Sequence, residues 1–150
     1  MFTESIEGGL VMKEGSLRFR AGGMAFVVFS ILFAVCVLTQ LYIAGMAVFV
    51  NPASWMRHVR LVHLFGFSLP LLMFISAFVG RLPRSILVQV LGVMLSIFLM
   101  YFTANITGTL PWAGALHPVI AVIILIQSLL IVKSAWGLLF LKHKGEGVEE

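Results

Sequence analysis

The sequence predicts an all-α integral membrane protein, folded as an up-down-up-down four-helix transmembrane bundle. Hydrophobic residues make up 61% of the 150-residue chain and charged residues only 11%, whereas soluble domains are about 45–50% apolar and about 25% charged. Four apolar stretches each approach the roughly 20 residues that a helix needs to cross a bilayer. The connections between them are short, so consecutive helices should run antiparallel.

The first two predicted spans are bounded by turn residues. The first span covers about residues 22–50 and ends at Asn51-Pro52, a pair that favours a turn or a new helix start. The second span covers about residues 54–79. It is followed by the polar sequence GRLPR at residues 80–84, which predicts a short hairpin.

The third and fourth spans are also separated by a tight loop. The third span covers about residues 85–106, and the fourth covers about residues 115–141. The loop between them carries Trp112, which is a candidate anchor at the membrane interface. The predicted domains are therefore an N-terminal tail at 1–21, the transmembrane domain at 22–141 and a C-terminal tail at 142–150.

The basic residues predict the orientation of the bundle. Lysines and arginines gather in the two tails and in the hairpin after the second span, which lie on one side under this topology. The positive-inside rule then places both termini in the cytoplasm. Arg57 and Arg60 lie on the opposite side, against the rule, so an anionic group should be near them.

The acidic residues exclude several kinds of chemistry. The chain has no aspartate, and its six glutamates all lie in the tails. A membrane domain without carboxylates has no acid–base pair and no carboxylate cage for calcium or magnesium. No nucleophile elbow, phosphate loop or metalloprotease motif is present. We therefore expect no independent catalytic activity, and the chain shows no base-reading surface for nucleic acid.

The segment MRHVRLVHLFG, at the start of the second span, holds two arginines and two histidines. At about 100° per residue, Arg60 and Gly66 share a helix face with His63, whereas His58 points about 140° away. If Lys133 marks the inner boundary of the fourth span, His63 and His117 both lie roughly 10 Å outside the membrane midplane. If that span continues to Leu141, His117 lies level with His58 instead. The pattern predicts that the Arg60 and His63 face points inward, and that His58 is turned aside near the interface.

Two histidines on facing helices at similar depth are candidate axial ligands of one b-type haem. We expect His63 and His117 to bind the metal, with His58 as the reserve ligand. Arg60, together with Arg57, would pair with the haem propionates, whose charge would explain arginines without acidic partners.

Further polar and small residues are candidates to line the same site. Gly66 and Ala121 would leave room for the macrocycle. Gln40, Tyr101 and Asn105 would line a haem or quinone pocket. The alternative for all these polar residues is ordinary hydrogen bonding between helices.

A zinc site formed by His58, His63 and His117 is a further alternative. Tetrahedral zinc usually takes closely spaced ligands and often cysteine or carboxylate. The first two histidines are five residues apart and point apart on a straight helix. This spacing favours haem over zinc.

The function expected from these residues is electron transfer, as a haem-binding membrane protein or a redox subunit. Its partners would be the lipid bilayer and other membrane redox subunits. The competing interpretation is a non-catalytic accessory subunit of a larger membrane complex, without a cofactor. In that case the polar residues would serve helix packing.

Four short motifs occur in order along residues 25–140: QLYIAGMAVF at the end of the first span, HVRLVHLFG, GRLPR and ALHPVIA. Through them the chain resembles a group of small bacterial four-helix membrane proteins of unknown function. The positions that match the group are Gln40, Gly45, His58, His63 and His117. The resemblance implies a bacterial inner membrane location and no defined activity. The histidine layout is also similar to that of small membrane b-type cytochromes.

Overall fold

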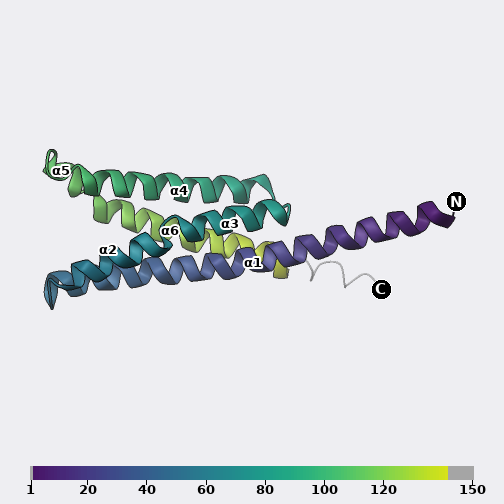
Figure 1. The fold of residues 1–150 in the computed structure, drawn as a ribbon, viewed down its shortest axis with the longest axis horizontal. Coiled ribbons are helices and arrows are strands. Elements are labelled where there is room, and N and C mark those ends of the chain that lie inside the picture. The colour runs from purple at the N-terminus through teal and green to yellow at the C-terminus, as the bar shows by residue number, and fades with distance from the viewer. Residues whose placement is uncertain (1, 142–150) are drawn as a thin grey trace.

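The computed structural model describes the backbone of residues 2–141 and the side chains of residues 17–139. The secondary structure of this part of the chain consists of helices joined by short turns and contains no strand. Its elements are α1 (Phe2–Phe49), α2 (Ser54–Phe65), α3 (Ser68–Val79), α4 (Arg84–Asn105), α5 (Pro111–Gly114), α6 (His117–Trp136) and the π-helical turn η1 (Gly137–Leu141) (Figure 1).

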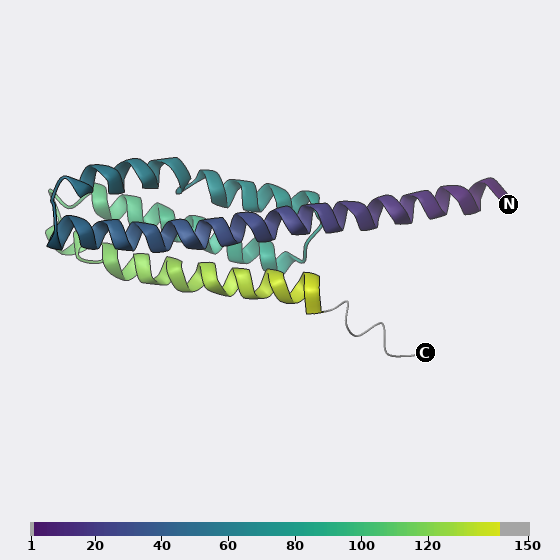
Figure 2. The ribbon, with the colours of Figure 1, turned by 90° about the horizontal axis from the view of Figure 1, so that it is seen from below.

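The long helices form the predicted up-down-up-down bundle. α1 packs against α3 and α6, and α4 packs against the same two helices, so the four close into a ring (Figures 1 and 2). Four stretches are long and apolar enough to cross a membrane: Leu17–Phe49, Ser54–Val79, Arg84–Asn105 and Pro111–Leu139. The prediction of an all-α transmembrane bundle is confirmed.

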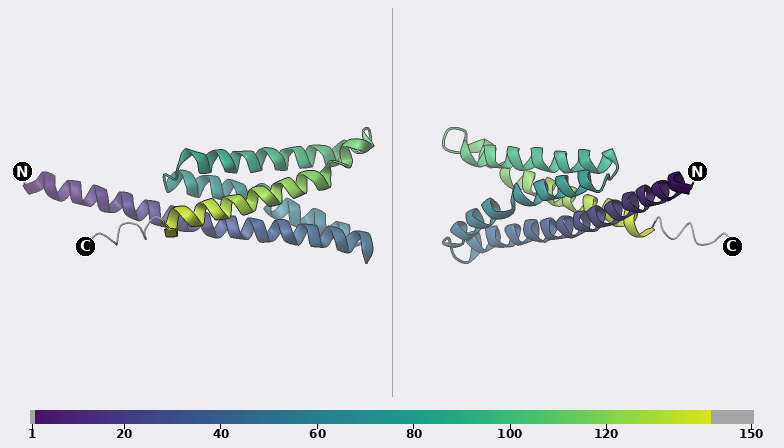
Figure 3. Two further views of the ribbon diagram at one scale, coloured as in Figure 1. Left: turned by 180° about the vertical axis from the view of Figure 1, so that it is seen from behind. Right: turned by 45° about the vertical axis from the view of Figure 1, so that its right-hand side comes forward.

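The two ends of the bundle differ. At one end, α1 enters and η1 leaves, and α1 projects beyond the other helices as far as Phe2 (Figure 3). The tail predicted at 1–21 is therefore helical from Phe2 onward. The tail predicted at 142–150 lies outside the described residues. The opposite end, which we call the α5 end, holds α5 and the turn between α1 and α2 (Figure 1).

The second predicted span is not one continuous helix. α2 ends at Phe65, and α3 begins at Ser68 after a short break. Pro70 has no N–H and cannot continue the hydrogen-bond ladder back to Gly66. The break lets the two halves take different directions: α3 lies beside both α1 and α4, whereas α2 packs mainly along α1 (Figure 1).

The core fills the centre of the ring and its half away from the α5 end. Its largest fully buried apolar side chains are Phe26, Phe33, Met73, Val90, Val93, Ile97, Ile124 and Ile131. Near the end where α1 enters, the helices come closest through two glycines. A Cβ atom on Gly22 would lie 2.5 Å from the Cα of Gly80 and 2.9 Å from the carbonyl oxygen of Ser76. Small residues permit such close approach between membrane helices.

Candidate pocket near the α5 end

A large pocket lies in the half of the bundle nearest the α5 end. Its volume is ≈ 560 Å³, and α1, α2, α4 and α6 all contribute to its wall. α2, which precedes the break at Gly66, packs along α1, whereas α3, which follows it, packs against both α1 and α4 (Figure 1). The pocket lies where α2 does not cover α4. Most lining side chains are apolar; the polar or aromatic-polar ones are Gln40, Trp55, His58, His63, Tyr101, Asn105 and His117.

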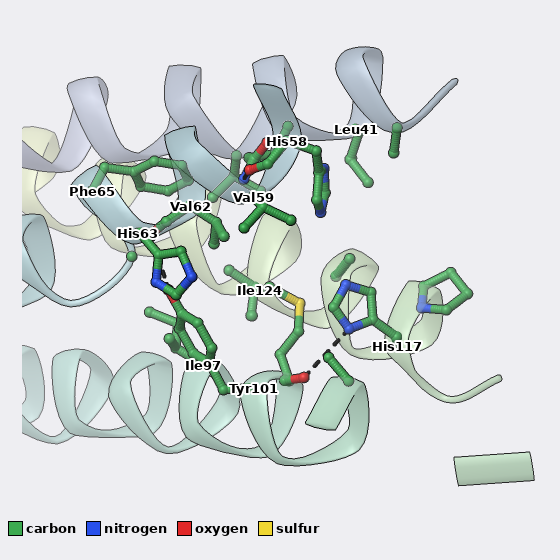
Figure 4. A pocket seen from close by; sticks show the side chains of 18 of the residues that line it. Leu41, His58, Val59, Val62, His63, Phe65, Ile97, Tyr101, His117 and Ile124 are labelled. Carbon is green, nitrogen blue, oxygen red and sulfur yellow. Dashed lines mark hydrogen bonds between the residues drawn. The ribbon is translucent and has the colours of Figure 1, made fainter. Parts of the chain in front are cut away.

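His58 and His117 face one another across this pocket. Their ring centroids are 6.3 Å apart and their planes are inclined at 57°. Figure 4 shows them on opposite walls, with His58 on α2 and His117 at the start of α6. Nδ1 of His117 lies 3.3 Å from the carbonyl oxygen of Met100, within hydrogen-bond distance. When Nδ1 donates its proton there, Nε2 of His117 is left with a free lone pair.

His58 contacts Gln40 of α1 and Trp55 of its own helix. The side-chain amide of Gln40 donates a hydrogen bond from Nε2 to the backbone carbonyl oxygen of His58, at 2.9 Å. The ring of Trp55 lies edge-on to the His58 ring, with centroids 5.6 Å apart. One buried polar atom in this wall, Oε1 of Gln40, has no partner. Such atoms usually indicate a missing water or ligand.

His63 lies in the same pocket but beside a different neighbour. Its ring centroid is 5.6 Å from that of Tyr101, and the planes are inclined at 37°. The Tyr101 hydroxyl donates a hydrogen bond to the carbonyl oxygen of Val62, at 3.1 Å. A Cβ atom on Gly66 would lie 3.1 Å from that hydroxyl and 2.6 Å from the Val62 oxygen. Gly66 therefore gives Tyr101 room to reach α2.

The helix face predicted to point inward differs from the one observed. Arg60 is exposed and lies outside the pocket lining, whereas His58 is half-buried and lines the pocket together with His63. α2 is instead anchored through Phe65, whose ring meets that of Phe33 edge-on at 5.9 Å. The prediction that His58 is turned aside is wrong because it assumed one continuous helix to residue 79. The break frees α2 to rotate according to its own contacts with α1.

The predicted site residues fall into two groups. Gln40, His58, His63, Gly66 and His117 all line the pocket. The arginines Arg57 and Arg60 are exposed and do not line it.

Sequence reasoning missed two contributors to the pocket wall. Trp55 was not singled out, although an aromatic residue three positions before His58 lies on the same helix face. The carbonyl oxygen of Met100 is a backbone group, so no pattern of side chains in the sequence predicts its contact with His117. Contacts of this kind depend on the register between α4 and α6.

The metal-binding capacity of the pocket comes from pairs of histidines. Among the described side chains, no group of three or more histidine, cysteine or acidic residues could hold a metal ion. The set His58, His63 and His117 thus offers no zinc triad in this arrangement. Residues 17–139 also contain no acid, so no carboxylate of the bundle can complete one.

Quinone recognition would need hydrogen-bond donors for the two quinone carbonyls. The expected donors, the side chains of Gln40, Tyr101 and Asn105, each make a hydrogen bond within the protein. Nδ2 of Asn105 donates to the carbonyl oxygen of Tyr101 at 2.8 Å, and the Tyr101 hydroxyl is used by Val62. Nε2 of Gln40 is used by His58. Each amide group keeps a second N–H, and Oε1 of Gln40 is unpaired, so these groups and the histidine rings can still meet a ligand.

Comparisons with known proteins give one match. A search of curated proteins and a search of solved structures found nothing similar. A family of unknown function, DUF6220, matches residues 40–108. The matched segment is less than half of the 150-residue chain. It includes Gln40, His58 and His63 but ends before His117. The expected likeness to a family of unknown function is thus confirmed over the stretch from the end of α1 to the end of α4, where this chain is similar to DUF6220.

Proposed function

We propose that this protein binds one b-type haem in the pocket near the α5 end and serves in electron transfer or as a redox subunit. His58 and His117 would be the axial ligands. His117 was expected in this role from the sequence, and His58 replaces His63 because of its position opposite His117.

The distance between the two rings carries the proposal. Two imidazoles bound to opposite sides of one metal ion have centroids about 6 Å apart, from two metal–nitrogen bonds of about 2 Å and two ring radii of about 1 Å. The observed separation is 6.3 Å. By contrast, the ring of His63 neighbours that of Tyr101.

The surroundings of His117 support a ligand role. Metal-binding histidines almost always donate their second ring N–H to a carbonyl or carboxylate, which fixes the tautomer and the ring orientation. The Met100 carbonyl oxygen is placed to accept this hydrogen bond from Nδ1. Nε2 would then face the haem iron.

The size and character of the pocket also suit the proposal. Cofactor sites are typically concave, about 300–1,000 Å³ in volume, and mostly apolar with a few placed polar groups. This pocket, at ≈ 560 Å³, has that character. A bound haem would supply a one-electron redox couple, and burial among apolar side chains would tune its potential. The arginines would not be needed for ligation, because they lie outside the lining.

Absorption spectroscopy tests the proposal directly. The protein, purified in mild detergent from a haem-replete host, should show a Soret band and sharp α-bands on reduction. His58→Ala and His117→Ala should each abolish the low-spin spectrum. His63→Ala serves as the matched control and should keep it. A colourless preparation from such a host would overturn haem binding. Loss of the spectrum in His63→Ala alone would restore His63 as the ligand.

We also propose that the bundle lies in a bacterial cytoplasmic membrane with both termini inside. The support is the gathering of basic residues at the end where α1 enters. Arg18, Arg20, Arg81 and Arg84 all lie toward that end, and the loop at 107–114 has no basic residue. Cytoplasmic enrichment of lysine and arginine is the general rule for short loops. The pocket would then open near the outer face.

The alternative function is a cofactor-free accessory subunit of a larger membrane complex. The observation that favours it is the low burial of the last span. Only 17% of the most apolar part of this span is buried within the bundle, against 44% for the first span. This leaves most of α6 for lipid or for a partner. Co-purification with stoichiometric membrane partners and without haem would support this alternative, and a haem-loaded monomer would exclude it.

A further inference from the structure

Arg57 and Arg60 lie on the side of α2 that faces away from the pocket. At about 100° per residue, they are about 140° and 160° around the helix from the pocket-lining Val62. Both side chains are exposed. Leu64 lies four residues after Arg60 on the same strip, and 72% of its surface is exposed. Two cations and one apolar side chain thus share one outward face.

The charge of this strip has no partner within the bundle. α2 packs against α1 and α3, and the sequence from residue 17 to residue 139 contains no acid. Arg57 and Arg60 are three residues apart, so their side chains are neighbours on the helix surface and repel one another. A bound anion between them would remove this repulsion.

The depth of the three residues indicates what kind of anion fits. At about 1.5 Å per residue, Arg57 and Arg60 lie about 4.5 Å and 9 Å from the start of α2 at Ser54. Leu64 lies about 6 Å further toward the bilayer centre. The order from the surface inward is therefore two cations and then an apolar side chain. A phospholipid presents its phosphate and its acyl chains in the same order.

We propose that Arg57, Arg60 and Leu64 form a binding site for one anionic phospholipid. The two guanidinium groups donate hydrogen bonds to oxygens of the headgroup phosphate, for which arginine geometry is well suited. Leu64 contacts an acyl chain. A free phosphate ion would use the arginines but gain nothing from Leu64. The site is separate from the pocket, so it does not depend on haem binding.

Native mass spectrometry of the detergent-purified full chain tests this proposal. The probes are phosphatidylglycerol and phosphatidylcholine with identical acyl chains. The first phosphatidylglycerol molecule to bind should bind more tightly than the first phosphatidylcholine molecule. Arg57→Gln and Arg60→Gln should each weaken phosphatidylglycerol binding about fivefold, and the double variant should weaken it about 30-fold. This is the loss expected if each arginine contributes the usual attraction of one basic side chain to an anionic lipid. Phosphatidylcholine carries the same phosphate, but its choline cancels the net charge, so its binding should weaken clearly less.

Matched variants make each outcome decisive. The double variant Arg81→Gln/Arg84→Gln removes the same charge at the other end of the bundle and should retain the first phosphatidylglycerol. Arg57→Lys/Arg60→Lys should recover part of the lost affinity. Equal binding of the two lipids, an equal loss in the Arg81/Arg84 variant, or displacement of phosphatidylglycerol by millimolar inorganic phosphate would each overturn the proposal.

Discussion

The imidazole ring of His58 on α2 lies 6.3 Å from that of His117 on α6, centroid to centroid, across a pocket lined mainly by apolar side chains. The two residues are far apart in the sequence and meet because α2 packs on α1 while α6 packs on both α1 and α4. The backbone of His58 is fixed by Gln40, and the ring of His117 by Met100. This opposed pair is the candidate ligand pair on which the proposed haem site rests.

The first prediction concerns the empty space beside Gly45, which lines the pocket. A Cβ atom on Gly45 would meet nothing within 4 Å. Gly45→Ala should therefore keep the fold and stabilise α1 by about 0.5–1 kcal/mol, because alanine has the higher helix propensity. Gly45→Phe should fill part of the pocket and strongly reduce the haem content of the purified protein.

The control for this prediction is the thermal unfolding midpoint in detergent. Gly45→Ala should unfold at or above the temperature of the apo wild-type chain, since its Cβ atom enters open space. Gly45→Phe should remain folded, with its ring inside the pocket. Full haem occupancy in Gly45→Phe would show that the ligand lies elsewhere. A much lower unfolding temperature in Gly45→Ala would mean that this part of the pocket is closed.

The second prediction concerns the hydrogen bond from the Tyr101 hydroxyl to the Val62 carbonyl oxygen, which joins α4 to α2 across the pocket. Tyr101→Phe removes this donor while keeping the ring beside His63. Interhelical hydrogen bonds in membranes contribute about 0.6 kcal/mol on average and at most about 1.7. Tyr101→Phe should lower the free energy of unfolding within that range. Tyr42→Phe, at a site 69% exposed to the surroundings, should leave it unchanged.

The measurement for Tyr101 is unfolding by sodium dodecyl sulfate in mixed micelles. A cost well above about 2 kcal/mol would exceed what one such bond contributes. That result would point to a larger polar network around His63 than the single bond described. No difference between Tyr101→Phe and Tyr42→Phe would mean that α2 and α4 are not joined by this bond.

The third prediction concerns the contact between α1 and α3 at Gly22 and Gly80. A methyl group on Gly22 would meet backbone atoms of Gly80 at 2.5 Å and of Ser76 at 2.9 Å. Backbone cannot move aside without separating the helices, and overpacking of this kind costs about 1–3 kcal/mol. Gly22→Ala should therefore destabilise the bundle by about that amount.

Gly23 provides the matched control for the third prediction. A methyl group there would also be crowded, at 2.7 Å, but its neighbour is the Cδ2 atom of Leu139, at the end of a flexible side chain. Gly23→Ala should consequently cost clearly less than Gly22→Ala in the same unfolding experiment. Equal costs would argue that α1 and α3 are not in backbone contact at Gly80.

The sequence predicted the architecture because composition and hydropathy suffice for it. Four long apolar stretches with short connections leave few alternatives to an antiparallel bundle. The identities of most polar pocket residues also followed, since histidine, glutamine and tyrosine are rare within membrane spans and stand out there.

The pairing of the histidines did not follow from the sequence. It depends on the rotation of α2 about its axis, and this changes at the break between Phe65 and Ser68. Pro70 signals that a break is possible but gives neither its angle nor the new phase. Extending one helical period across the break put Arg60 inside and turned His58 aside. The edge-on contact of Phe65 with Phe33 selects a different face of α2.

The last prediction concerns orientation. Cys36 is the only cysteine, so its replacement by serine gives a background for single-cysteine labelling. Gly108 lies in the loop at the α5 end, where a side chain would meet nothing within 4 Å, and Ser85 is exposed near the opposite end. In intact cells, a membrane-impermeant maleimide should label Gly108→Cys but not Ser85→Cys, if the basic end is cytoplasmic. Permeabilisation should make Ser85→Cys reactive. The reverse pattern would place the pocket near the cytoplasmic face and would show that Arg57 and Arg60 obey the positive-inside rule.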